Sequence, residues 1–157
     1  WSELSEKYDG TVLSNGRVLH TGDKYLNFHI PSMGVPLTDE IRFSSYAKAA
    51  EFFKDDFGGD PVLFGCSSWL LYGKYLDFLP EKSNLRKFIL DFELIGQWEN
   101  KNFGDAWRIF DRFADLPAEQ WPRDTSLRRL FAEYVEAGNK TGGGFGVIQF
   151  DKGKIIR

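Results

Sequence analysis

Residues 25–36 read YLNFHIPSMGVP, an alternating apolar and polar run that ends in two prolines and a glycine. Successive side chains of a strand point to opposite faces, so positions 26, 28 and 30 are expected to share an apolar face. Asn27 and His29 then lie on the opposite face. The prolines and the glycine end the strand. The stretch predicts a strand that carries two polar side chains to a loop, where mixed α/β domains commonly place binding and catalytic groups.

The composition favours one domain with an aromatic core. The 157 residues, with 15 Phe, 6 Tyr and 5 Trp, are enough to bury a core or to line a cleft with aromatic rings. A net charge of −3 without a basic cluster argues against nucleic-acid binding, because phosphate neutralisation needs clustered Lys and Arg. No apolar run approaches the roughly 20 residues that span a bilayer, so no membrane partner is expected. The one cysteine, Cys66, excludes an internal disulfide and is typical of a cytoplasmic protein.

Turn and helix signals surround the opening stretch. Residues 1–7 are expected to be a polar lead-in or a helical tail, and Asn15-Gly16 predicts a hairpin of two short strands before residue 21. Thr38, followed by two acids, predicts the start of a helix. Its apolar face is expected to hold Phe43, Ala47, Ala50, Phe53 and Phe57.

The second half of the chain alternates strand and helix signals. Strands are expected at 61–66, 92–99 and 145–150, and helices at 85–90, 105–114 and 125–137, with Trp107 on the apolar face of the second helix. A final hairpin is expected to end near residue 156. This order predicts an α/β sandwich with a mixed, mostly antiparallel sheet and about four flanking helices.

Three segments in this order carry a resemblance to a known family: LNFHIPSMGVPLT (26–38), FGCSSWLL (64–71) and LPEKSNLRKF (79–88), with a weaker TSLRRL run at 125–130. Together they resemble the C-terminal, GNAT-like domain of bacterial two-domain N-acyltransferase-like proteins. The resemblance implies a GNAT-like acyl-CoA N-acyltransferase fold for residues 1–157 and an upstream N-terminal domain as partner. It also implies transfer of an acyl group from acyl-CoA or an acyl-carrier-protein thioester to a small-molecule amine, with no covalently bound cofactor.

His29 is the first catalytic candidate, because a neutral imidazole can take a proton from an attacking amine near pH 7. Asn27, on the same strand face, could orient the imidazole or the acyl carbonyl. The alternative interpretation is that the His29 ring bonds only to the backbone of the following loop. Cys66 is a candidate nucleophile, but no basic neighbour in the sequence would lower its pKa. Direct attack through a tetrahedral intermediate is therefore preferred.

The expected contacts with the acyl donor are Phe64, Gly65, Ser67, Ser68, Trp69, Asn84, Gly143 and Gly144. Trp69 either lines an acyl channel or packs in the core, and Asn84 either contacts the ligand or caps a helix. The glycines belong to residues 139–144, expected to be flexible, and they either approach the ligand or form a mobile connector. Arg128 is expected to be a solvated helix charge. Two histidines and one cysteine argue against a zinc site.

The sequence also leaves a second class of function open. A pyrophosphate is commonly held by a Gln/Arg-x-x-Gly-x-Gly/Ala run at the start of a helix. The sequence has no such run before a predicted helix, and its glycines at 142–144 lead into a strand instead. This observation favours a non-catalytic, GNAT-like module that binds a ligand or a companion domain. A purely structural interaction domain is the third interpretation, and it predicts a large exposed apolar patch.

Overall fold

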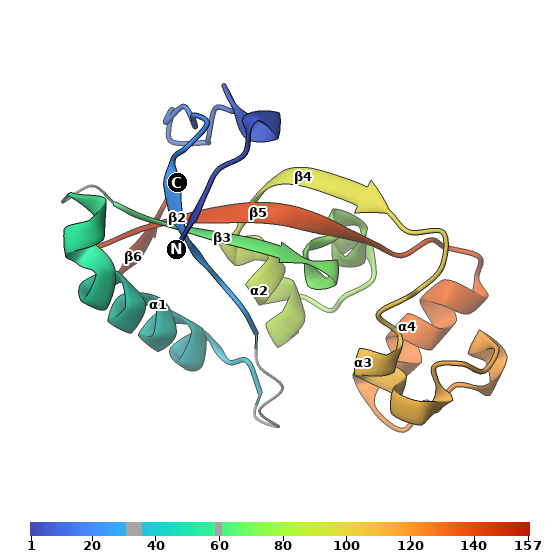
Figure 1. Cartoon of the computed structure of the whole chain (residues 1–157). Helices are drawn as coiled ribbons and strands as arrows, with labels where there is room; N and C mark the ends of the chain where they lie inside the picture. The colour runs from blue at the N-terminus through green and yellow to red at the C-terminus, as the bar shows by residue number, and fades with distance from the viewer. Residues whose placement is uncertain (31–35, 59–60) are drawn as a thin grey trace.

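The computed structural model describes residues 1–30, 36–58 and 61–157, and in these residues six strands form one sheet (Figure 1). The strand order is β1-β2-β3-β5-β4, with β6 paired to β5. Only the β2–β3 pair is parallel among these strands. The mixed, mostly antiparallel sheet is therefore confirmed. The strands are β1 Ser2–Glu3, β2 Lys24–Asn27, β3 Val62–Ser68, β4 Glu93–Glu99, β5 Gly142–Asp151 and β6 Lys154–Ile156.

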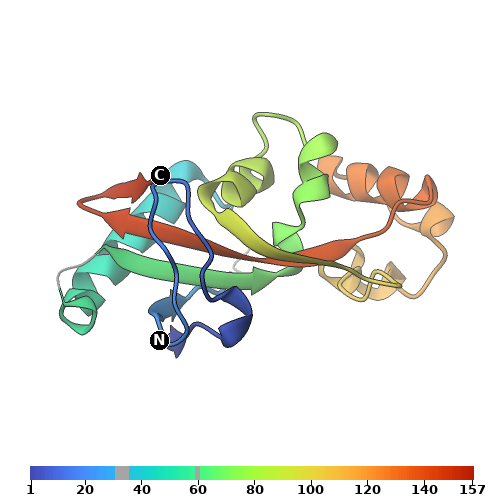
Figure 2. The same cartoon turned by 90° about the horizontal axis from the view of Figure 1, so that it is seen from above.

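Four α-helices accompany the sheet in the described part of the chain: α1 Asp39–Phe53, α2 Asn84–Asp91, α3 Trp107–Phe110 and α4 Ser126–Glu136. Three of them begin at a hydroxyl that accepts a hydrogen bond from a backbone N–H of the first turn, at Thr38, Ser83 and Thr125. Figures 1 and 2 show α1 and α2 along the sheet, and α3 with α4 beyond one end of it. No helix among these residues has the length and apolar character needed to cross a membrane.

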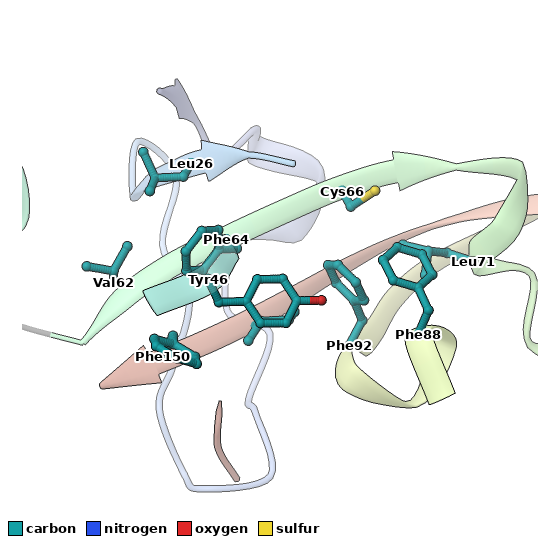
Figure 3. Close-up of a cluster of buried hydrophobic side chains, with 10 residues drawn as sticks. Leu26, Tyr46, Val62, Phe64, Cys66, Leu71, Phe88, Phe92 and Phe150 are labelled. Carbon is teal, nitrogen blue, oxygen red and sulfur yellow. The ribbon is translucent and has the colours of Figure 1, made fainter. Parts of the chain in front are cut away.

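The sheet buries apolar side chains on both faces. On one face Phe64 and Cys66 of β3 pack with Tyr46 of α1 and Phe88 of α2 (Figure 3). On the other face Leu63 packs with leucines of the N-terminal segment, which crosses the sheet opposite α1 and α2 (Figure 1). A third cluster holds α3 and α4 against residues 72–79. The alternation of β3 between two buried faces explains why residues 62–66 read as a continuous apolar run.

A buried polar cluster joins α1 to α2. Arg42 Nε donates to an Asp91 carboxylate oxygen at 2.6 Å, and the Tyr46 hydroxyl donates to the same oxygen at 3.0 Å. The Arg42 guanidinium also donates to the Leu37 carbonyl at 2.9 Å and to Asp39 at 2.9 Å. Arg42 is only 2% exposed, so its three partners, Asp91, Leu37 and Asp39, take the place of water around its charge.

The glycines of β5 are part of the sheet, so the prediction of a flexible 139–144 stretch is wrong from Gly142 onward. A Cβ on Gly143 would lie 2.6 Å from the Trp98 indole, and one on Gly144 would lie 2.1 Å from the Leu71 carbonyl oxygen. The missing side chains let β4 and the turn after β3 approach the centre of the sheet.

Several predicted elements differ from the structure. Residues 1–7 contain β1, which pairs with β2, and the predicted first hairpin is reduced to one bridge between Val12 and Val18. In α1 the buried side chains are Arg42 and Tyr46. Of the predicted inner face, Ala50, Phe53 and Phe57 pack against the core, whereas Phe43 and Ala47 are exposed, so the prediction is wrong for the first half of the helix. The predicted 105–114 helix is divided into the four-residue α3 and a 3-10 helix over Asp111–Phe113, and its Trp107 is exposed. The proline and glycine signals at 31–35 lie outside the described residues.

Candidate functional site

The parallel strands β2 and β3 separate after two paired positions, Leu26 with Phe64 and Asn27 with Gly65. Asn27 is in register with Gly65, and the Phe28 N–H donates to the Gly65 carbonyl at 2.8 Å. Beyond this bond β3 remains paired with β5 as far as Ser68, but no described backbone hydrogen bond links residues 28–30 to residues 66–68. The backbone groups of a strand point to alternate sides, so those of Ser67 point the same way as those of Gly65, toward β2. At Ser67 strand β2 has already diverged, so a ligand can bond to the backbone N–H and C=O of Ser67.

A pocket of about 440 Å³ lies where the two strands separate. Its lining comes from the end of β2, the end of β3 with the turn that follows it, and the region of α3: Phe28, His29, Ile30, Cys66, Ser67, Ser68, Trp69, Leu70, Asp105, Trp107, Arg108 and Asp111. The carboxyl ends of parallel strands are a common place for ligands in α/β proteins. The pocket therefore combines an open strand edge with apolar and ionisable side chains.

His29 lines this pocket, two residues after the last residue of β2, and its side chain is exposed. Leu26, Phe28 and Ile30 pack against the core on the other face of the segment, as the alternation predicted. Asn27 is exposed and outside the pocket lining. The structure thus brings the imidazole, but not the Asn27 amide, to the pocket.

Cys66 also contributes to the pocket lining, but its side chain belongs to the core (Figure 3). The residue is 2% exposed, and burial raises the pKa of the Cys66 thiol to about 12. A thiol with such a pKa stays protonated near pH 7 and is a poor nucleophile. The geometry therefore argues against an acyl-Cys66 intermediate.

The residues after Cys66 form the inner wall of the pocket. Ser68 Oγ accepts a hydrogen bond from the Leu70 N–H at 3.2 Å and so caps the turn that follows β3. Trp69 is half-buried, and its ring packs against Phe131 with the centroids 5.7 Å apart. Ser67 is exposed at the open strand edge. Trp69 therefore packs in the core and also lines the pocket.

Five of the predicted donor contacts lie outside the lining of this pocket: Phe64, Gly65, Asn84, Gly143 and Gly144. Phe64 is a core residue, and a Cβ on Gly65 would lie 2.4 Å from the Tyr25 ring. The missing side chain of Gly65 therefore leaves space for the Tyr25 ring. Asn84 is the first residue of α2, and Ser83, not Asn84, caps that helix.

The sequence analysis missed the wall that α3 supplies. Arg108 Nε donates to Asp105 at 3.0 Å, and the Arg108 guanidinium lies 4.5 Å from the centroid of the exposed Trp107 ring. Asp111 lies next along this wall, with a backbone φ of 51°. Its carboxylate accepts a hydrogen bond from the Arg128 guanidinium at 2.7 Å. Arg128 is not the predicted solvated charge, because its side chain is 20% exposed and links α4 to α3. The Asp105–Arg108 spacing was the only local signal that these residues act together.

Comparison with known proteins identified one family and several similar structures. A family model described as the GNAT-like C-terminal domain matches residues 3–148. A crystal structure of an acyltransferase in complex with decanoyl-CoA has a TM-score of 0.67 and 23% identity, and the match covers 92% of this chain and 44% of that chain. An acyltransferase in complex with CoA and 10C-teicoplanin has a TM-score of 0.68 and 22% identity, covering 89% and 43%. The chain spans less than half the length of these structures, and the likeness shows a shared fold. No curated protein matched the sequence.

Proposed function

Because the chain belongs to the family of GNAT-like C-terminal domains, we propose that it takes part in the transfer of an acyl group from a coenzyme A or carrier-protein thioester to a small-molecule amine. The observation that carries this proposal is the separation of β2 and β3, which leaves an open strand edge and a pocket at their carboxyl ends. The similar acyltransferases that hold CoA or decanoyl-CoA support a thioester donor. A companion domain of the same protein is a further part of the proposal.

In this proposal the donor enters between the separated strands. An amide-containing thiol arm would bond to the backbone N–H and C=O of Ser67, each bond contributing about 0.5–1.5 kcal/mol. The acyl chain would then lie against Phe28, Trp69 and Leu70, which give the pocket its apolar part. These contacts place the thioester carbonyl within the same pocket as His29.

The reaction then proceeds by direct attack. The amine nitrogen bonds to the thioester carbonyl carbon, the carbonyl electron pair moves to oxygen, and His29 accepts the proton that the nitrogen loses. Collapse of the tetrahedral intermediate breaks the carbon–sulfur bond, and the thiolate leaves and takes up a proton. Cys66 takes no part, because burial raises its thiol pKa to about 12. Asn27 lies outside the pocket lining, so these steps assign it no role.

The proposal is tested by comparing the two histidines of the chain. CoA, acetyl-CoA and decanoyl-CoA are titrated by calorimetry, and acyl transfer to a panel of amines is measured for His29→Ala and His20→Ala. We expect His29→Ala to retain donor binding and to lose about 10²–10⁴-fold in turnover. His20 is exposed, lies 3.8 Å from Asp9 and is outside the pocket, so its variant should behave like the wild type. Absence of binding to every donor, or equal turnover in both variants, would defeat the proposal.

A non-catalytic module remains the second candidate, and one feature favours it. The first turn of α1, the helix that follows β2, carries Asp39 and Glu40. Negative charge at a helix N-terminus opposes the binding of a phosphate there. A module of this kind predicts ligand binding without turnover and no functional effect of His29→Ala, so the same variants distinguish the two candidates.

A further inference from the structure

A second pocket of about 400 Å³ is lined in part by Phe103, whose ring packs against Trp69 of the first pocket. Loop residues 100–103, the C-terminal end of α4 and residues 138–141 form its sides. Phe103, Trp121 and Val135 contribute apolar surface, while Lys101 and Lys140 line it with charged side chains.

Two aromatic rings separate the two pockets. Trp69 lines the first pocket and Phe103 lines the second, and their ring centroids are 5.7 Å apart with an angle of 57° between the planes. Both residues are half-buried, and both rings also pack against Phe131. These ring contacts link the lining of one pocket to the lining of the other.

We propose that Trp69 and Phe103 set the longest acyl chain that the donor pocket accepts, an inference that rests on the proposed function. An acyl chain that reaches the indole of Trp69 meets a ring backed by Phe103 and Phe131, and it cannot continue. Removal of these rings would connect the pocket with the apolar surface of the second one. Trp69 and Phe103 are specificity-determining residues in this account, and neither takes part in the bond changes.

The experiment measures dissociation constants of the 157-residue chain for CoA and for acyl-CoAs of 2, 8, 10 and 16 carbons, below their micelle concentrations. The variants are Trp69→Leu, Trp69→Phe and Trp69→Leu with Phe103→Ala. The matched control is Trp98→Leu, which removes an indole outside the lining of both pockets. Near-ultraviolet circular dichroism identifies any variant that has lost its packing, and Trp69→Phe retains an aromatic ring in the core.

In the wild type and in Trp98→Leu, affinity should rise with chain length and then stop rising at the same length. In the Trp69 variants this limit should move to longer chains, with about a fourfold gain in affinity for each further methylene that is buried. Two results would overturn the inference if the wild type binds CoA. One is a chain-length limit that stays the same in the folded variants, and the other is a wild type whose affinity shows no chain-length limit. Loss of CoA binding by the wild type itself would instead overturn the proposed function.

Discussion

Truncation of Asp91 to alanine is a direct test of the polar cluster between α1 and α2. The carboxylate is 8% exposed and accepts bonds from Arg42 and Tyr46, so the variant leaves a buried guanidinium and a buried hydroxyl without this partner. Removing one member of a buried ion pair costs about 3–5 kcal/mol, and a buried hydroxyl without an acceptor costs about 1–3 kcal/mol. Leu37 and Asp39 still hold the guanidinium, so we expect a loss of about 4 kcal/mol in the free energy of unfolding.

Urea unfolding followed by circular dichroism at pH 7 measures this loss. Asp39→Ala is the control, because Asp39 bonds to the same guanidinium at 2.9 Å but is 53% exposed, and we expect it to cost less than about 1 kcal/mol. Replacing the cluster by Arg42→Met, Tyr46→Phe and Asp91→Leu together should recover most of the stability, since apolar replacements of buried ion pairs are often neutral or stabilising. If Asp91→Ala costs no more than Asp39→Ala, the reasoning from buried charge is refuted.

Two further predictions concern stability and thiol chemistry. Gly144→Ala places a Cβ 2.1 Å from the Leu71 carbonyl oxygen, so urea unfolding should show a loss of about 2–3 kcal/mol in the free energy of unfolding. Gly104 has open space where its Cβ would be, so Gly104→Ala should change that free energy by less than about 0.5 kcal/mol. Equal losses in the two variants would contradict this packing argument. Cys66 should react with a disulfide reagent at pH 8 only as fast as the chain unfolds, and rapid labelling of the native protein would show that its thiol is accessible. Burial raises the pKa of this thiol from 9.0 to about 12, so its contribution to stability is complete below pH 9 and is lost as the pH rises toward 12; stability should fall more steeply over this interval in the wild type than in Cys66→Ala.

Alternation in the sequence predicted the β2 segment because its two faces meet different surroundings. Leu26 is buried and Asn27 is exposed, so a period of two is visible in the residue types. The same kind of argument was right for Ala50, Phe53 and Phe57, which pack against the core, and wrong for Phe43 and Ala47, which are exposed. A count of apolar side chains assigns Phe43 to the core and Arg42 to solvent, because it cannot include Asp91, which is 49 residues away and makes the burial of Arg42 favourable.

The local part of the site was also predictable, whereas its assembly was not. Four of the lining residues are consecutive, Cys66, Ser67, Ser68 and Trp69, so the end of β3 brings them to the pocket together. His29 joins them from the segment that follows β2. The wall around α3 depends on packing between segments far apart in the sequence, and the Asp105–Arg108 spacing is its only local sign. The glycines of β5 were misread for a related reason, since the groups that occupy the space beside them come from other elements.

The central position of β5 has a consequence for synthesis of the chain. β3 and β4 do not pair with each other in the described sheet, because both pair with β5, which begins at residue 142. During translation β4 emerges before the strand that must fill the gap beside β3, and apolar surface stays uncovered for that interval. Closure of this gap joins distant parts of the chain, which slows folding and exposes the nascent protein to aggregation. Holding chaperones should therefore raise the yield of native protein most when they act before residues 142–157 leave the ribosome.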